Sequence, residues 1–185
     1  MGQVKGSAIT ARIRFVRERF GESGYRRVHD ALSPEHRALL DARVLPHAWV
    51  PYDFFIALNV EIDRMFGAGD LASCVEMGRF AADVNLPTLY RIFYKLGSPL
   101  YIMQKAAKVW AVHYDSGELQ AAEDGPNAVR LRIDGFAEPH RAHCLSVLGW
   151  AARSIEISGA TLLSADEPLC RARGEEACEM ILKWR

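Results

Sequence analysis

The sequence has no excess of either charge. Its 23 lysine and arginine residues balance 23 aspartate and glutamate residues, so the formal net charge is zero. A protein that binds duplex DNA needs a basic face to contact the phosphates, and this balance argues against that class. It also gives no electrostatic reason to dock on an anionic membrane. No stretch approaches the roughly 18 uninterrupted apolar residues of a membrane-spanning helix. We therefore expect neither direct nucleic-acid binding nor a membrane span.

Targeting and catalytic motifs are lacking as well. Residues 1–10 contain no long apolar stretch of the kind found in a secretory signal peptide, so we expect the cytoplasm. The chain has no G-x-S-x-G nucleophile elbow, no glycine-rich phosphate loop and no H-E-x-x-H zinc motif. No acid–base pair stands out either, and we predict that the protein is not an enzyme.

Repeats, low-complexity segments and long linkers are also absent, so the 185 residues predict a single domain. Its first part, residues 1–97, is mainly helical in pattern. Apolar residues recur there at helical spacing, and Ser33-Pro34 is a helix start signal of serine followed by proline, repeated later at Ser98-Pro99. Helices are expected over residues 9–20, 23–32, 34–43, 51–66, 71–84, 88–94 and 98–114.

The second part, residues 98–185, changes to alternating apolar and polar residues after Gly117. Residues 128–134 read as a half-buried strand that pairs with residues 118–123 in a hairpin. A helix opened by Pro139 follows, and residues 161–166 and 179–184 form a second hairpin. The predicted fold class is α+β, with a helical N-terminal part and a roughly four-stranded antiparallel sheet (hairpin, helix, hairpin) packed on helices.

Three of the four cysteines and one glutamate form a pattern in the last quarter of the chain. Cys144 is followed after 22 residues by Glu167, which begins the run E-P-L-C that ends at Cys170, and Cys178 follows after seven more residues. Three thiolates and one carboxylate complete a tetrahedral shell for zinc. The four residues therefore predict a closed structural metal site.

Two alternatives to this metal site remain open from the residues alone. Cysteine is among the most buried residue types, so these residues also fit small core positions. His143 is a substitute ligand if Glu167 points away from the cysteines. Cys74, in the middle of a predicted helix, fits no ligand pattern and is expected in the core.

About the last 45 residues resemble the vinyl-reductase-type (4-vinyl reductase) small-molecule-binding domain. The shared features are Cys144, the run L-S-V-L-G-W ending at Trp150, the runs E-P-L-C and R-A-R-G, and Cys178 before an apolar strand. That family occurs in phenol-sensing transcription activators and in chlorophyll-biosynthesis accessory proteins. Its zinc-containing members use a cysteine before this helix, a glutamate, and two further cysteines at matching spacing. The resemblance implies zinc held by Cys144, Glu167, Cys170 and Cys178.

The same superfamily includes core subunits of the TRAPP vesicle-tethering complex and is distantly similar to the haem nitric-oxide/oxygen-binding domain. The run V-K-G at residues 4–6 and F-V-R-E-R-F-G at residues 15–21 resemble the start of those haem domains. The overall sequence pattern of the chain is also similar to that of a family of uncharacterised proteins that has many members in myxobacteria. Haem-binding relatives carry a mid-chain histidine and a Tyr-x-Ser-x-Arg motif. Residues 88–104 contain no histidine and that motif is absent, so we expect no haem.

In the resembling sensors, a small-molecule pocket lined by aromatic side chains lies between the helices and the sheet. The residues of this chain that suit such a lining are Phe93, Tyr94, Tyr101, Trp110, His113 and Trp150. Each of them also fits a core or structural position, as aromatic residues at helical spacing often do.

These observations predict a non-enzymatic sensory or regulatory domain in signalling, which binds a small apolar molecule or an unidentified protein partner and contains structural zinc. The resemblance implies that it works as a homodimer. One alternative is a TRAPP-like scaffold or adaptor dimer without a ligand. Another is an accessory to an enzyme.

Overall fold

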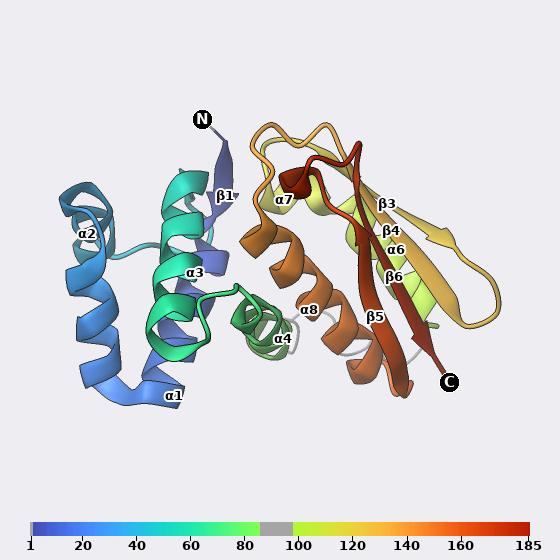
Figure 1. The fold of residues 1–185 in the computed structure, drawn as a ribbon, viewed down its shortest axis with the longest axis horizontal. Coiled ribbons are helices and arrows are strands. Elements are labelled where there is room, and N and C mark those ends of the chain that lie inside the picture. Colours follow the sequence, from blue (N-terminus) through green and yellow to red (C-terminus); the bar gives the residue numbers. More distant parts are fainter. Residues whose placement is uncertain (1, 86–97) are drawn as a thin grey trace.

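The protein has a group of helices followed by a four-stranded antiparallel sheet, as seen in the computed structural model (Figure 1). The structure describes residues 2–85 and 98–185. The first elements are β1 (Gln3–Lys5), α1 (Gly6–Ala31), α2 (Pro34–Asp41), β2 (Trp49–Pro51), α3 (Tyr52–Phe66) and α4 (Ser73–Asn85). The later elements are α6 (Pro99–Lys108), α7 (Trp110–His113), β3 (Glu118–Glu123), β4 (Ala128–Asp134), α8 (Arg141–Ile157), β5 (Leu162–Leu169), the short 3-10 turn η1 (Arg171–Arg173) and β6 (Cys178–Trp184). The predicted α+β fold class is confirmed.

Capping residues in the sequence determine where several helices begin. The side chain of Ser33 accepts a hydrogen bond from the backbone N–H of His36 at the start of α2. Ser98 does the same for Tyr101 at the start of α6. Inside α1, Gly21 has a φ of 69°, which glycine adopts at little cost, and it interrupts the helix where the sequence predicts a stop. Both serine-proline start signals are therefore confirmed.

The sheet has the strand order β3-β4-β6-β5, so the two predicted hairpins join through β4 and β6. Leu131 of β4 lies opposite Met180 of β6, and both are fully buried. Helix α8 lies between this sheet and α4 (Figure 1). One side of α8 therefore faces the sheet, and the other side faces the N-terminal helices.

Two glycines let α4 and α8 approach each other closely. A Cβ atom on Gly149 would clash with the backbone oxygen of Val75, and a Cβ on Gly78 would clash with that of Ser146. Interiors packed this densely leave no room for the added atoms, so neither position accepts a side chain without moving a helix. Gly78 and Gly149 therefore serve the close packing of α4 against α8.

Three features differ from the sequence-based prediction. The small sheet formed by β1 and β2 was not anticipated, because strands of three residues carry almost no periodic signal. The helix predicted over residues 98–114 is broken at Val109 (φ −104°, ψ 10°) into α6 and α7, and the indole N–H of Trp110 donates to the backbone oxygen of Ser116. Helix α4 begins only at Ser73, because Leu71 has a left-handed φ of 70°. The helix predicted over residues 88–94 lies outside the described residues.

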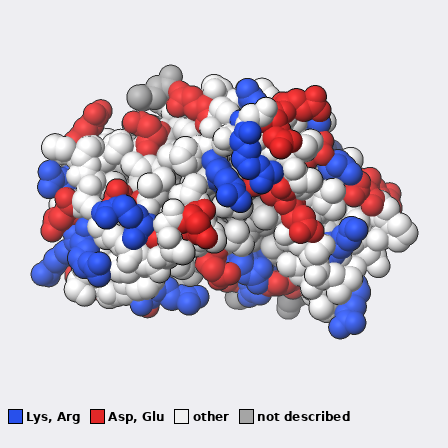
Figure 2. Space-filling view, viewed as in Figure 1, with Lys and Arg blue, Asp and Glu red and all other residues white. Residues whose placement is uncertain are grey.

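The surface has no strong preference for one charge on the face seen in Figure 2, where basic and acidic side chains are interspersed. Within residues 2–85 and 98–185, no helix has both the length and the apolar character needed to cross a membrane.

Candidate functional site

Three cysteines from different elements meet at the start of α8. Cys144 lies in the first turn of α8, Cys170 follows β5, and Cys178 begins β6. Their sulfur atoms all lie within 4.8 Å of one another, and those of Cys144 and Cys178 are 3.4 Å apart. Three sulfurs bound at about 2.3 Å to one tetrahedral zinc would lie about 3.8 Å apart. The spacing of the cysteines is therefore close to that of three ligands of one metal ion.

The side chain of Glu167 is buried beside this cluster, and its carboxylate accepts no hydrogen bond within the described part of the chain. A register shift in β5 takes it out of the ladder with β6. Its side chain is 4% exposed, and both carboxylate oxygens lack a hydrogen-bond partner. Arg141 Nε and Arg173 Nη1 lie 3.6 and 3.9 Å from Oε2. Burial and the neighbouring thiol of Cys170 raise the pKa of Glu167 to about 7. A metal ion is one group that would satisfy this carboxylate.

Hydrogen bonding inside the cluster makes the pKa values of the three thiols differ. A hydrogen bond with Cys144 lowers the pKa of Cys170 and of Cys178, although burial opposes this, and the pKa of Cys144 is raised. The backbone N–H of Arg171 also donates to Cys178 Sγ at 3.4 Å. The thiolate, which is the form that binds metal, is thus favoured at two of the three sulfurs.

The alternative ligand, His143, belongs to a different environment. Its ring packs against those of Tyr114 and Phe136, with 4.7 Å between centroids in each case, and it is outside the clustered ligand groups. Burial lowers the pKa of His143 to about 3, so its imidazole is neutral. Cys74 is completely buried in α4, as expected for a core residue.

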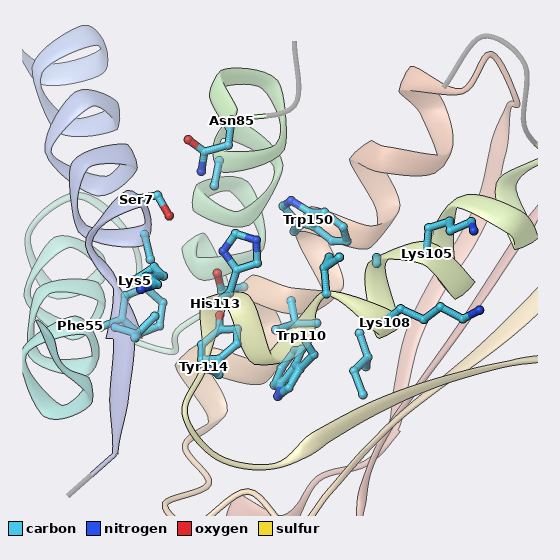
Figure 3. A pocket seen from close by; sticks show the side chains of 18 of the residues that line it. Lys5, Ser7, Phe55, Asn85, Lys105, Lys108, Trp110, His113, Tyr114 and Trp150 are labelled. Carbon is cyan, nitrogen blue, oxygen red and sulfur yellow. The ribbon is translucent and has the colours of Figure 1, made fainter. Parts of the chain in front are cut away.

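A cavity of about 420 Å³ lies on the other side of α8, between that helix, α1, α6 and α7. Pockets that bind small molecules have volumes of about 300–1,000 Å³ and mostly apolar walls. Phe55 and Val147 contribute to such a wall here. In Figure 3, the side chains of His113 and Tyr114 project into the same space as Trp150 from α8. The cavity therefore has the size and lining of a ligand pocket.

Four of the six pocket residues predicted from the sequence lie at this cavity. Tyr101, Trp110, His113 and Trp150 all line it, and Trp110 and His113 reach it from α7, beyond the break at Val109. The remaining two, Phe93 and Tyr94, lie outside the described residues. A role of these side chains in ligand binding stays a prediction.

The polar groups of the cavity wall are neutral or positively charged. Desolvation in the cavity wall and the charge of Lys5 lower the pKa of His113, which favours its neutral imidazole. Burial raises the pKa of Tyr114 to about 12, so its phenol keeps its proton. The charged residues in the described wall are Lys5, Arg12, Lys105 and Lys108, and all of them are basic.

Sequence reasoning missed Arg12, although a signal for it exists. Arg12 lies three residues after Ile9 and four before Val16, which places it on the buried face of α1. It is 1% exposed and contacts three other helices through Asn59, Met77 and Ser146. A charged residue inside an apolar stripe indicates a function or a polar network, and the stripe is readable from residue spacing alone.

Comparison with known proteins identifies the fold. No protein-family profile matches the chain, and no curated protein matches it in sequence. Solved structures that share its fold include an H-NOX protein from Shewanella oneidensis in the Fe(II) state, with 12% identity, a TM-score of 0.78, and coverage of 98% of this chain and 96% of that one. An Fe(II) unliganded H-NOX protein from K. algicida aligns at 11% identity and a TM-score of 0.71, over 98% and 96% of the two chains. An oxygen complex of an H-NOX domain related to soluble guanylate cyclases aligns at 13% identity and a TM-score of 0.66, over 98% and 95%.

These comparisons correct two interpretations. The vinyl-reductase-type assignment is wrong, because the structural matches are H-NOX proteins that align with almost the whole chain. The resemblance rested on about the last 45 residues, where a local cluster of cysteines dominates the pattern. The expectation of no haem is also wrong, because proteins of this fold are described in Fe(II) and Fe(II)NO states. It relied on the absence of a histidine in residues 88–104 and on the absence of a Tyr-x-Ser-x-Arg motif.

Proposed function

We propose that the protein is a sensory domain that binds a small molecule in the cavity between α1, α6, α7 and α8. The observation that carries this proposal is a mostly apolar cavity of about 420 Å³ that has the imidazole of His113 in its wall. The shared fold with H-NOX proteins in Fe(II), Fe(II)NO and oxygen-bound states supports haem as the occupant.

The chemistry of the wall suits haem. A neutral imidazole is a common axial ligand of haem iron, and His113 supplies one. Lys105 and Lys108 lie along the same wall, and their positive charge would attract anionic propionate groups through solvent. Apolar and aromatic side chains such as Phe55 and Trp110 would keep water from the ring faces. When bound, haem would supply iron that can bind a diatomic gas.

Titration of the purified protein with hemin tests this proposal. We expect stoichiometric binding, with a Soret band that shifts on reduction and again on addition of nitric oxide. His113→Ala should weaken haem binding by at least about tenfold, which corresponds to the loss of one axial bond worth more than about 1.4 kcal/mol. His47→Ala is the matched control, because His47 is exposed and outside the described cavity wall. Equal haem binding by the two variants would overturn the role of His113.

A structural zinc site is the second part of the proposal. Its support is the convergence of Cys144, Cys170 and Cys178, together with the buried, unsatisfied carboxylate of Glu167. A thiolate-rich tetrahedral set of this kind is closed to substrate and suits zinc in a structural role. Zinc there would tie the start of α8 to the hairpin of β5 and β6.

The remaining features of the proposal concern organisation. We propose that residues 1–185 act as one domain, because a single core cluster includes residues from both parts, such as Ile9 and Leu182. The homodimer stays a prediction that light scattering tests, and the protein partner stays a prediction that affinity capture tests. The cytoplasm is the compartment we propose, since free thiols persist under reducing conditions.

A further inference from the structure

We propose that the cavity selects ligands that carry an anionic group, and that the buried guanidinium of Arg12 is the group that binds it. This inference rests on the ligand-binding function proposed above and names the chemical class of the ligand: a carboxylate, or a similar anion, attached to an apolar ring system.

Arg12 combines burial with a position in the cavity wall. It is 1% exposed and lines the cavity together with Ser146. Its Nε donates to Asn59 Oδ1 at 2.7 Å, one Nη donates to the backbone oxygen of Met77 at 3.0 Å, and the other donates to Ser146 Oγ. A guanidinium has five N–H donors, so these contacts leave two of them for a ligand.

None of these partners carries a negative charge. Within the described residues, Arg12 makes no ion pair with an aspartate or glutamate, and no acidic residue lines the cavity. Burial lowers the pKa of Arg12 to about 10, so it is still protonated at neutral pH. A buried charge without a counter-ion is costly, and an anion in the cavity would remove that cost.

The lysines of the wall are less suited to this role. The amine of Lys5 donates to the backbone oxygen of His47 and lies 3.8 Å from the centre of the Trp49 ring. Figure 3 shows the amino groups of Lys105 and Lys108 directed away from His113 and Trp110. Lysines on an open wall attract anions weakly through solvent, whereas Arg12 offers a fork of donors in a low-dielectric site.

The nearby aromatic side chains indicate what the anion is attached to. The guanidinium of Arg12 lies 5.3 Å from the ring centre of Phe55, and Trp110 and Trp150 line the same cavity. A ligand with a flat apolar body and one negative group would contact both kinds of surface. Haem, through a propionate, and a free aromatic acid share this chemistry.

Two matched dyes test the inference on the full chain. We expect the anion 1-anilinonaphthalene-8-sulfonate to bind at least about tenfold more tightly than the neutral N-phenyl-1-naphthylamine, as charge-assisted hydrogen bonds of more than about 1.4 kcal/mol predict. Arg12→Met should reduce this preference, measured as the ratio of the two dye affinities, to about twofold or less. Arg14→Met is the control, because Arg14 is on the same helix and its side chain is 58% exposed.

The outcomes separate the two proposals. Equal affinity for both dyes in the unaltered protein would overturn the role of Arg12 even if Arg12→Met does not fold, and it would leave ligand binding intact. Binding of neither dye and no binding of hemin would overturn the proposed function itself. Hemin and its dimethyl ester form a second pair: a preference for hemin that Arg12→Met removes indicates a propionate, and a preference confined to the dyes indicates a free acid.

Discussion

The cysteine cluster and the cavity share helix α8, yet their chemistry is opposite. The cluster lies at the start of the helix around Cys144, is closed to solvent, and consists of three thiols, with the buried carboxylate of Glu167 beside them. The cavity lies further along, at Ser146 and Trp150, and its charged residues are all basic. Thiolates and a carboxylate attract a cation and hold it permanently, whereas a partly open basic cavity suits an exchangeable anion.

Under the proposed function, α8 separates a structural task from a binding task. Ser146 is only two residues after Cys144, but its side chain accepts a hydrogen bond from Arg12 on the side of α8 that faces α1. Cys144 contacts Cys178 on the side of the sheet. A change at the cluster should therefore alter mainly stability, and a change at the cavity should alter ligand affinity.

The largest expected effect comes from removing a cysteine of the cluster. We expect Cys178→Ser to lower the free energy of unfolding by about 4 kcal/mol or more, the range typical of losing a metal or disulfide. Treatment of the unaltered protein with a strong zinc chelator should produce a similar loss. Chemical denaturation combined with metal analysis by mass spectrometry measures both effects.

Cys74→Ser is the matched control for that experiment, because Cys74 is equally buried but stands alone in α4. It should cost only about 1–3 kcal/mol, the penalty of burying a hydroxyl group, and should leave the response to chelator unchanged. The proposed metal site would be contradicted if the purified protein contains no stoichiometric zinc and both serine variants are equally destabilised.

The close approach of α4 and α8 gives the next largest effect. Gly149→Ala and Gly78→Ala each force a backbone contact, and each should cost about 2–3 kcal/mol of stability, as overpacking usually does. Only Gly78→Ala pushes on Ser146, which lines the cavity. It should therefore also weaken binding of anilinonaphthalene sulfonate, and Gly149→Ala should not. Thermal unfolding and dye titration measure the two quantities, and equal loss of dye affinity in both variants would contradict the proposed division of α8.

The sequence could predict the fold class and much of the cluster because both depend on local signals. Strand alternation over residues 128–134 and the serine cap at Ser33 are readable without tertiary information. Cys170 and Cys178 flank one short turn, so their proximity follows from the hairpin alone.

The cavity was much harder to predict, because it depends on contacts distant in the chain. Arg12 meets Met77 and Ser146 across separations of 65 and 134 residues, which no periodicity reveals. The break at Val109, which brings Trp110 and His113 to the cavity from α7, also lacks a glycine or proline signal. A family assignment from a local cysteine pattern failed for the same reason: it described a short cysteine-containing hairpin and not the path of the whole chain.

The smallest expected effect concerns the far end of α8, where Glu156 bonds to Arg79 of α4 and to Arg153. Burial raises the pKa of Glu156, but these two hydrogen bonds outweigh it and hold the pKa below its usual range. A lowered folded-state pKa stabilises the protein above the unfolded pKa of about 4.3, and this stability is lost as the pH falls through the folded value.

We therefore expect Glu156→Gln to cost about 1 kcal/mol at pH 7 and almost nothing at pH 3, as for a partly exposed ion pair. Glu76→Gln is the control, because Glu76 is 64% exposed and lies 3.9 Å from Arg79. Thermal unfolding at both pH values measures the difference. Since Glu156 lies in the last turn of α8, away from Cys144 and Ser146, neither zinc content nor dye affinity should change. A loss of either would show that α8 transmits changes along its length, and the two sites would then be coupled.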